Sequence, residues 1–210
     1  SAADMLAALR ADFAGYEPLR AQLNSLPRFG VEDPLSDGMC NRLLQSVGAA
    51  AAQQRTRFGG LLKPMIFNFV WTPSASRELA ARGDGSPAGA LIGHGMTPHS
   101  RAMTRGITAA MNSSLSLDYH CICGGATTMW DVDEQWINAD LMKALLKAFL
   151  AGGGMIFQGN TTSVDQLEDA YAHPERYPNL IVRVGGFSAR FTTLGRDVQQ
   201  EIILRRRHRR

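Results

Sequence analysis

Two groups of residues have types and spacing that could serve catalysis or metal binding. They are the glycine pair Gly185 and Gly186, and the cluster His120, Cys121 and Cys123. The glycines follow the apolar run LIVRV and precede FSARF. Glycine lacks a Cβ, so such a pair after a strand most often marks a tight turn or a close approach of two backbones. The pair alone therefore predicts a turn, and a chemical role needs support from the surrounding sequence.

The His and Cys cluster has ligand types that bind metals, and His94 or His99 would be needed to complete it. Structural zinc sites normally consist of two spaced ligand pairs, which this cluster does not provide. We interpret it as strand residues with soft side chains and predict no metal site. The glycines at 152–154 precede a strand instead of joining a strand to a helix, so we do not expect them to bind phosphate, and no hydrolase triad is visible.

The first third of the sequence is mostly helical. Apolar residues at helical spacing predict helices near residues 2–14, 16–26 and 39–55. Residues 64–71 then predict a buried strand. The stretch from 72 to about 99 is rich in Gly, Ser and Pro, with a helix near residue 82, and such long loops are usually functional or pack against another protein.

The second half alternates strands and helices. A short helix is expected within residues 100–114, and the helix 138–151 is capped by Asn138 and ended by the glycines that follow. The strand MIFQGN, a helix opened by a capping box of Ser163 and Gln166, and the strand LIVRV at 180–184 come next. This order predicts a parallel α/β unit.

Charge and cysteine content indicate where the protein is located and which partners it binds. The net charge is +3, but the terminal sequence RRRHRR carries five arginines, so residues 1–204 carry 3 − 5 = −2. We interpret this basic tail as a solvated terminus and not as a nucleic-acid interface, because no aromatic residues are interleaved with it. An odd cysteine count and the lack of a long apolar run favour a soluble cytoplasmic protein with reduced thiols and no membrane or nucleic-acid partner.

The stretch YPNLIVRVGGFSARFTTLGRDVQQEIILR resembles the C-terminal signature of the glycyl radical enzymes. That signature runs arginine, valine, small residue, radical glycine and aromatic residue, followed by a short turn and a helix. The resemblance places the radical on Gly186. It assigns support of the radical loop to the neighbouring residues Arg183, Val184, Gly185, Phe187 and Ser188. Phe187 stands where a tyrosine is more usual.

Upstream segments carry the same resemblance from about residue 16 onward. GGGMIFQGN is similar to the glycine-rich turn and strand of the family, although Gly159 replaces a frequent aromatic residue, and GHGMTPHSRAMTRGITAAMNSS is similar to its proline loop and helix start. The likeness is greater to the lyase, dehydratase and decarboxylase branches than to pyruvate formate-lyase.

The resemblance implies an α/β fold that forms about half of a ten-stranded barrel. Residues 1–210 would be a single C-terminal region with the radical loop at 183–191 and the basic tail at 205–210. Loss of a hydrogen atom from a glycine Cα gives a planar radical, and other residues reach that planarity only with a side-chain clash. A partner activase would install the radical with S-adenosylmethionine, in the absence of oxygen, and the chain would bind no cofactor. We expect Arg183 to pair with a carboxylate.

In the family, a cysteine on a separate loop takes up the radical and attacks the substrate. Cys40 lies in a helical pattern, and Cys121 and Cys123 do not resemble that loop. The sequence therefore predicts a radical-storing small subunit, or a fragment, that is inactive without a larger chain bearing the cysteine. Together they would cleave C–C, C–O or C–S bonds of a small substrate. Two alternatives are a spare part that repairs an oxygen-damaged enzyme and a degenerate structural subunit.

Overall fold

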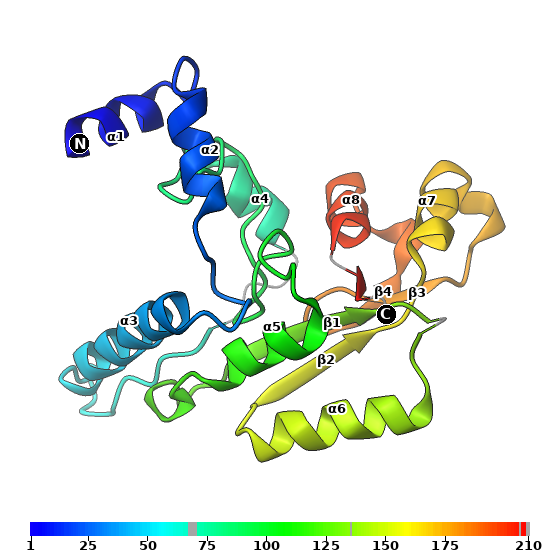
Figure 1. Ribbon diagram of the computed structural model, residues 1–210. Helices are drawn as coiled ribbons and strands as arrows, with labels where there is room; N and C mark the ends of the chain where they lie inside the picture. The colour runs from blue at the N-terminus through cyan, green and yellow to red at the C-terminus, as the bar shows by residue number, and fades with distance from the viewer. Residues whose placement is uncertain (67–70, 135, 206, 209–210) are drawn as a thin grey trace. The chain divides into compact units, whose positions relative to one another are not determined.

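The structure is a computed structural model that describes residues 1–66, 71–134, 136–205 and 207–208. It divides into two compact units, one of Ser1–Pro27 with Trp71–Ile92 and the other of Arg28–Val70 with Gly93–Arg210. Figure 1 labels the elements of both units in chain order.

The first unit consists of three helices and a long loop. The helices are α1 (Ala2–Arg10), α2 (Glu17–Ser25) and α4 (Thr72–Arg77). The loop after α4 is held by side chains, because the Asp12 carboxylate accepts the backbone N–H of Ala88 at 2.7 Å. The helix expected near residue 82 is wrong. Arg82 lies in a turn, where its guanidinium donates to the carbonyl of Ala90 at 3.0 Å.

The second unit begins with the helix α3 (Pro34–Ala52). It starts earlier than the expected residue 39 because the Asp33 carboxylate accepts the Ser36 N–H at 2.8 Å and Pro34 occupies the first turn. Cys40 lies on α3, as predicted. The helix packs beside the single-turn helix η1 (Tyr119–Cys121), so the interpretation of Cys121 as a strand residue is wrong.

A three-stranded parallel sheet in the order β2-β1-β5 forms the centre of this unit. Its strands are β1 (Thr127–Val132), β2 (Ile156–Asn160) and β5 (Arg207–His208), and the helices beside it are α5 (Gly106–Leu115) and α6 (Ala139–Ala151). The Asn138 side chain caps α6 and Gly152 ends it, as predicted. The parallel crossover is β1-α6-β2, with Met129 opposite Gln158.

The two faces of this sheet differ in chemistry because successive strand residues point to opposite sides. Trp130, Val132 and Phe157 belong to an apolar cluster with residues of α5 and α6. The other face carries the residues that alternate with them. We call these residues, Met129, Asp131, Gln158 and Asn160, the polar face of the sheet.

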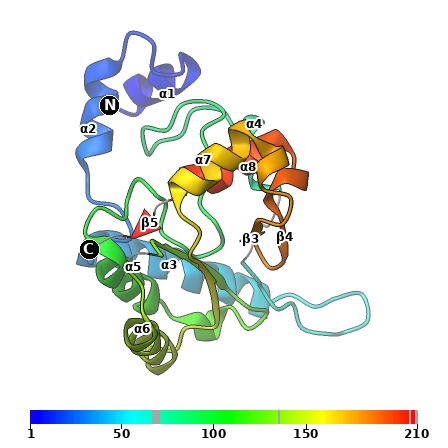
Figure 2. The same cartoon turned by 90° about the vertical axis from the view of Figure 1, so that its right-hand side faces the viewer.

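The C-terminal segment has a core of its own. It contains α7 (Val164–Ala172), η2 (Pro174–Arg176), β3 (Ile181–Arg183), β4 (Ser188–Arg190), η3 (Phe191–Thr193) and α8 (Arg196–Leu204). Leu167, Val182, Phe191 and Ile202 are among its buried residues. Figures 1 and 2 both show α7 and α8 side by side next to the hairpin of β3 and β4.

The expected parallel unit of β2, α7 and β3 is wrong. β3 pairs with β4 as an antiparallel hairpin, because the chain turns back directly after it, and β2 pairs with β1. The sequence reasoning missed β1, although TTMWDV is rich in β-formers. Of the strand expected at 64–71, Ile66 forms a parallel bridge with Ala126, while residues 67–70 lie outside the described residues.

Candidate functional site

The glycine pair lies at the tip of the β3–β4 hairpin. Arg183 and Ser188 are paired across the hairpin, and the Val184 N–H donates to the Phe187 carbonyl at 2.9 Å to close the turn. Gly186 has a φ of +97°, a left-handed backbone conformation that side chains rarely adopt. The sequence prediction of a glycine turn is therefore confirmed, and Gly186 is the residue that the turn requires to be glycine.

The base and the tip of the hairpin differ in burial. Val184 is 1% exposed within the C-terminal core, and Gly185 is buried as well. Gly186 is exposed, and Phe187 is 44% exposed. A groove of about 430 Å³ lined by Leu146, Phe157 and Ile181, among others, lies beside the same hairpin. The base of the loop is thus buried, while the part of the chain that the structure describes leaves the Gly186 tip exposed.

Gln158 on the polar face of the sheet reaches the glycine turn. Its side-chain Oε1 accepts the backbone N–H of Gly186 at 2.6 Å and the Nε–H of Arg183 at 3.3 Å. Gln158 is 5% exposed. Sequence reasoning missed this residue, although a glutamine within the otherwise apolar run MIFQ was an available signal of a buried polar contact.

The guanidinium of Arg183 contacts neutral groups. Besides Gln158, its Nη1 lies 3.5 Å from the Ser188 hydroxyl. Within the described residues no carboxylate pairs with Arg183, so the expected ion pair is wrong. The reason is topological, because the neighbouring strand β2 presents an amide at this position. Arg183 therefore acts here as a hydrogen-bond donor that faces the same oxygen as Gly186.

Arg205 holds the strand that enters the turn. Its guanidinium donates to the carbonyl of Arg183 at 2.8 Å and to that of Val184 at 2.5 Å. It also makes two bonds with the Glu201 carboxylate, at 2.9 and 2.7 Å. The basic tail was interpreted as solvated, which is wrong for Arg205 because this residue is 6% exposed. A terminal arginine run does not reveal which member is buried.

His94 completes this polar network from another part of the chain. Its Nε2 lies 2.6 Å from Oε1 of Glu201. Burial of Glu201 acts to raise its pKa, but the hydrogen bonds from His94 and Arg205 outweigh burial and hold the pKa at about 2. Glu201 is therefore a carboxylate at neutral pH and only accepts, so Nε2 of His94 donates to it.

We expect Arg205→Met to destabilise the protein by about 3–5 kcal/mol, because it leaves the buried Glu201 charge without its arginine. Urea unfolding of the protein, followed by circular dichroism, measures this free energy. The matched control Arg190→Met removes an exposed arginine of β4 and should change the free energy of unfolding by less than about 0.5 kcal/mol. Equal effects of the two substitutions would contradict a structural role for Arg205.

Two of the three cysteines lie beside a core cluster that contains no residue of the hairpin. Cys40 and Cys121 pack against a core cluster with Leu44 and Ile122, and burial raises the pKa of the Cys40 thiol. The Cys121 thiol donates to Asp118 at 3.4 Å, and Cys123 is exposed. In the described part of the chain, no three His, Cys, Asp or Glu side chains are grouped to hold a metal ion.

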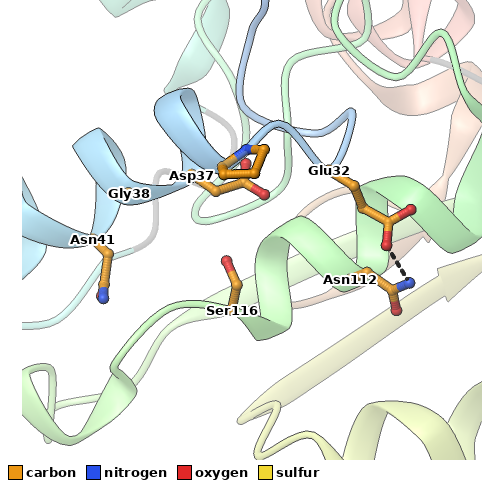
Figure 3. Close-up of a pocket in the computed structure, with 7 residues that line it drawn as sticks. Glu32, Asp37, Gly38, Asn41, Asn112 and Ser116 are labelled. Atoms are coloured by element: carbon orange, nitrogen blue, oxygen red, sulfur yellow. Dashed lines mark hydrogen bonds between the residues drawn. The ribbon is translucent and has the colours of Figure 1, made fainter.

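A second hollow, of about 360 Å³, lies between the start of α3 and the helix α5 (Figure 3). Glu32 accepts a hydrogen bond from the Asn112 amide at 2.8 Å at its edge. Asp37 is 9% exposed there, and burial raises its pKa. None of the described residues that line the hollow belongs to the glycine hairpin.

Comparison with known proteins identifies the family that the chain resembles. A family model described as "Glycine radical" matches residues 92–192, and one described as "Pyruvate formate lyase-like" matches residues 1–71. The probable dehydratase YbiW of Escherichia coli K12 is 33% identical over 97% of this chain and 27% of its own length. Trans-4-hydroxy-L-proline dehydratase of Clostridioides difficile is 27% identical over 95% of this chain and 26% of its own length.

Among solved structures, the glycerol-bound form of the B12-independent glycerol dehydratase from Clostridium butyricum superposes with a TM-score of 0.93. It is 25% identical and covers 98% of this chain and 27% of its own. The chain belongs to the glycyl radical enzyme family. Its α/β fold is part of the barrel of that family, as predicted.

The chain spans about a quarter of the length of the relatives that it matches.

In the described segments, none of the helices has the length and apolar character required to cross a bilayer.

Proposed function

We propose that this chain stores a glycyl radical at Gly186 and works with a cysteine-bearing chain to cleave a C–C, C–O or C–S bond of a small substrate. The observation that carries the proposal is the position of Gly186. It combines a left-handed backbone at a hairpin tip with an anchored hairpin base, within the part of the chain that the glycine radical family model matches.

The reaction begins with a separate protein that acts on Gly186. A radical S-adenosylmethionine activase removes a hydrogen atom from the Cα of Gly186, and the planar radical that remains is delocalised over the flanking amide groups. The radical then passes by hydrogen-atom transfer to a cysteine thiol of the partner, and the thiyl attacks an unreactive C–H bond of the substrate. Dehydration or another elimination follows, a class of reaction supported by the similarity to dehydratases.

The exposure of the hairpin tip supports the proposal of a partner chain. A carbon radical survives only when water, oxygen and stray hydrogen donors are excluded, yet Gly186 and Phe187 are exposed in this chain. Ile181, in the adjacent groove, is 59% exposed. A covering surface with the cysteine loop would shield the radical and supply the thiol, while Cys40 and Cys121 pack in a separate cluster.

Affinity purification of the natural gene product under anaerobic conditions tests the two-chain arrangement. We expect a larger polypeptide with a cysteine loop to co-purify in a stable complex, identified by mass spectrometry. A single longer polypeptide that contains both the cysteine and Gly186 would contradict a separate subunit while leaving radical storage intact.

A spare part that restores a damaged enzyme remains the second candidate. It is favoured by the compact C-terminal core, which holds the radical hairpin without residues of the first unit. It would associate with a full-length enzyme cleaved at its own radical loop, so the co-purifying chain would end at that loop. The α3 helix and the parallel sheet favour the subunit, because repair needs little beyond the radical hairpin.

A further inference from the structure

Gln158 is a buried polar residue whose side-chain oxygen accepts two hydrogen bonds from the glycine hairpin. It lies on β2 and is 5% exposed, on the polar face of the sheet and away from the apolar cluster of α5 and α6. A buried amide oxygen without hydrogen bonds is unfavourable. Gln158 avoids this cost through the two donors from the hairpin, the Gly186 N–H and the Arg183 Nε–H.

The chemistry of these donors determines which way the Gln158 amide faces. A backbone N–H and a guanidinium can only donate, so the side-chain atom between them must be the oxygen and not the NH₂ group. Arg183 thus holds the amide in the orientation in which Oε1 accepts from Gly186. The distances of 2.6 Å to Gly186 N and 3.3 Å to Arg183 Nε are consistent with this arrangement.

The bond from Gly186 fixes the peptide group next to the atom that would hold the radical. The Gly186 nitrogen is bonded directly to this Cα, and its N–H donates to the Gln158 side chain on β2. The hydrogen bond from the Val184 N–H to the Phe187 carbonyl closes the same turn. Rotation about the N–Cα bond, which sets the φ of +97°, is therefore restricted. An acceptor on the N–H also draws on its proton and makes the nitrogen a better electron donor to a radical on Cα.

We propose that Gln158 is a positioning residue that stabilises the Gly186 radical by accepting the Gly186 N–H. This inference rests on radical storage at Gly186, as stated under the proposed function. It adds a residue from β2 to the site, 28 positions upstream of the glycine. Gln158 does not contact the substrate in this role and acts only through the peptide group of Gly186.

The test compares two substitutions of Gln158 in the activated complex. Gln158→Met keeps the length of the side chain and removes the acceptor, whereas Gln158→Glu keeps an acceptor for Gly186 and Arg183. Electron paramagnetic resonance (EPR) gives the radical yield and its anaerobic decay rate. We expect Gln158→Met to decay about tenfold faster than the parent, as loss of one buried hydrogen bond implies, and Gln158→Glu to decay within about threefold of it.

Asn160→Leu is the matched control, because it removes another buried amide of β2 on the same face, one whose oxygen lies 3.4 Å from the Thr162 hydroxyl and not beside the Gly186 N–H. It should leave the decay rate of the radical unchanged. Equal decay in the parent, Gln158→Met and Asn160→Leu would overturn the inference. Faster decay in Asn160→Leu than in Gln158→Met would overturn it as well, because disturbance of β2 would then explain the effect.

A second measurement observes Gln158 in the parent protein itself. In protein labelled with [5-¹³C]glutamine, electron-nuclear double resonance of the radical should show a weak ¹³C coupling that is missing from Gln158→Glu. Its absence from the parent would overturn the role of Gln158 while leaving radical storage in place. A parent protein that forms no glycine radical under activation would overturn the proposed function, and this inference with it.

Discussion

Anaerobic activation with the cognate activase and S-adenosylmethionine should give an organic radical with a glycine-type EPR doublet, and Gly186→Ala should abolish it. The doublet arises from the one hydrogen that remains on the glycine Cα. Alanine has a methyl group in place of one of the two Cα hydrogens, and at a φ of +97° it is strained by about 1–2 kcal/mol even before activation. EPR at low temperature, with double integration of the signal, measures the loss.

The neighbouring glycine provides the control for this experiment. Gly185 is also a glycine of the turn, but it does not have a positive φ and is buried at the base of the hairpin. We expect Gly185→Ala to retain a doublet with the same splitting, even where its methyl group lowers the yield. A doublet that survives Gly186→Ala and disappears in Gly185→Ala would assign the radical to the other glycine.

The sequence predicted the elements that depend on local chemistry. Asn138 and Gly152 bound α6 because a cap and a helix stop act within one turn of the chain. The glycine turn was likewise predictable, since a positive φ in a tight turn requires glycine. The partner of β3 was mispredicted because strand order depends on pairing, and an apolar strand alone does not reveal whether its neighbour is β2 or β4.

The contacts that support the glycine turn connect residues that are far apart in sequence. Gln158 lies in the parallel sheet and Gly186 in the turn of the β3–β4 hairpin, and His94 bonds Glu201 across 107 positions of the sequence. Composition could not identify Arg205 either, because it is the first of a run of arginines that together resemble a solvated tail. These residues became visible only when the fold brought their side chains together, which is why the motif located Gly186 but not its hydrogen-bond partners.

Exposure of the activated protein to air should cut the backbone at Gly186 and release the segment from Phe187 to Arg210. A carbon radical combines with O₂ at close to the rate of encounter, and the peroxyl group that forms on a backbone carbon leads to fragmentation of the chain there. Gly186 is exposed among the described residues, so O₂ can reach this carbon. Intact-mass spectrometry before and after exposure to air measures the loss.

Three controls assign the cut to the radical. Protein that has not been activated should keep its mass in air, because the Cα of an ordinary glycine does not react with O₂. Activated samples of Gly186→Ala should also stay intact, whereas Gly185→Ala should be cut at Gly186 in proportion to its radical content. The position of the cut is read directly from the mass of the released segment. An unchanged mass in a sample shown by EPR to hold a radical would place the unpaired electron at another residue, because the reaction with O₂ occurs where the spin density lies.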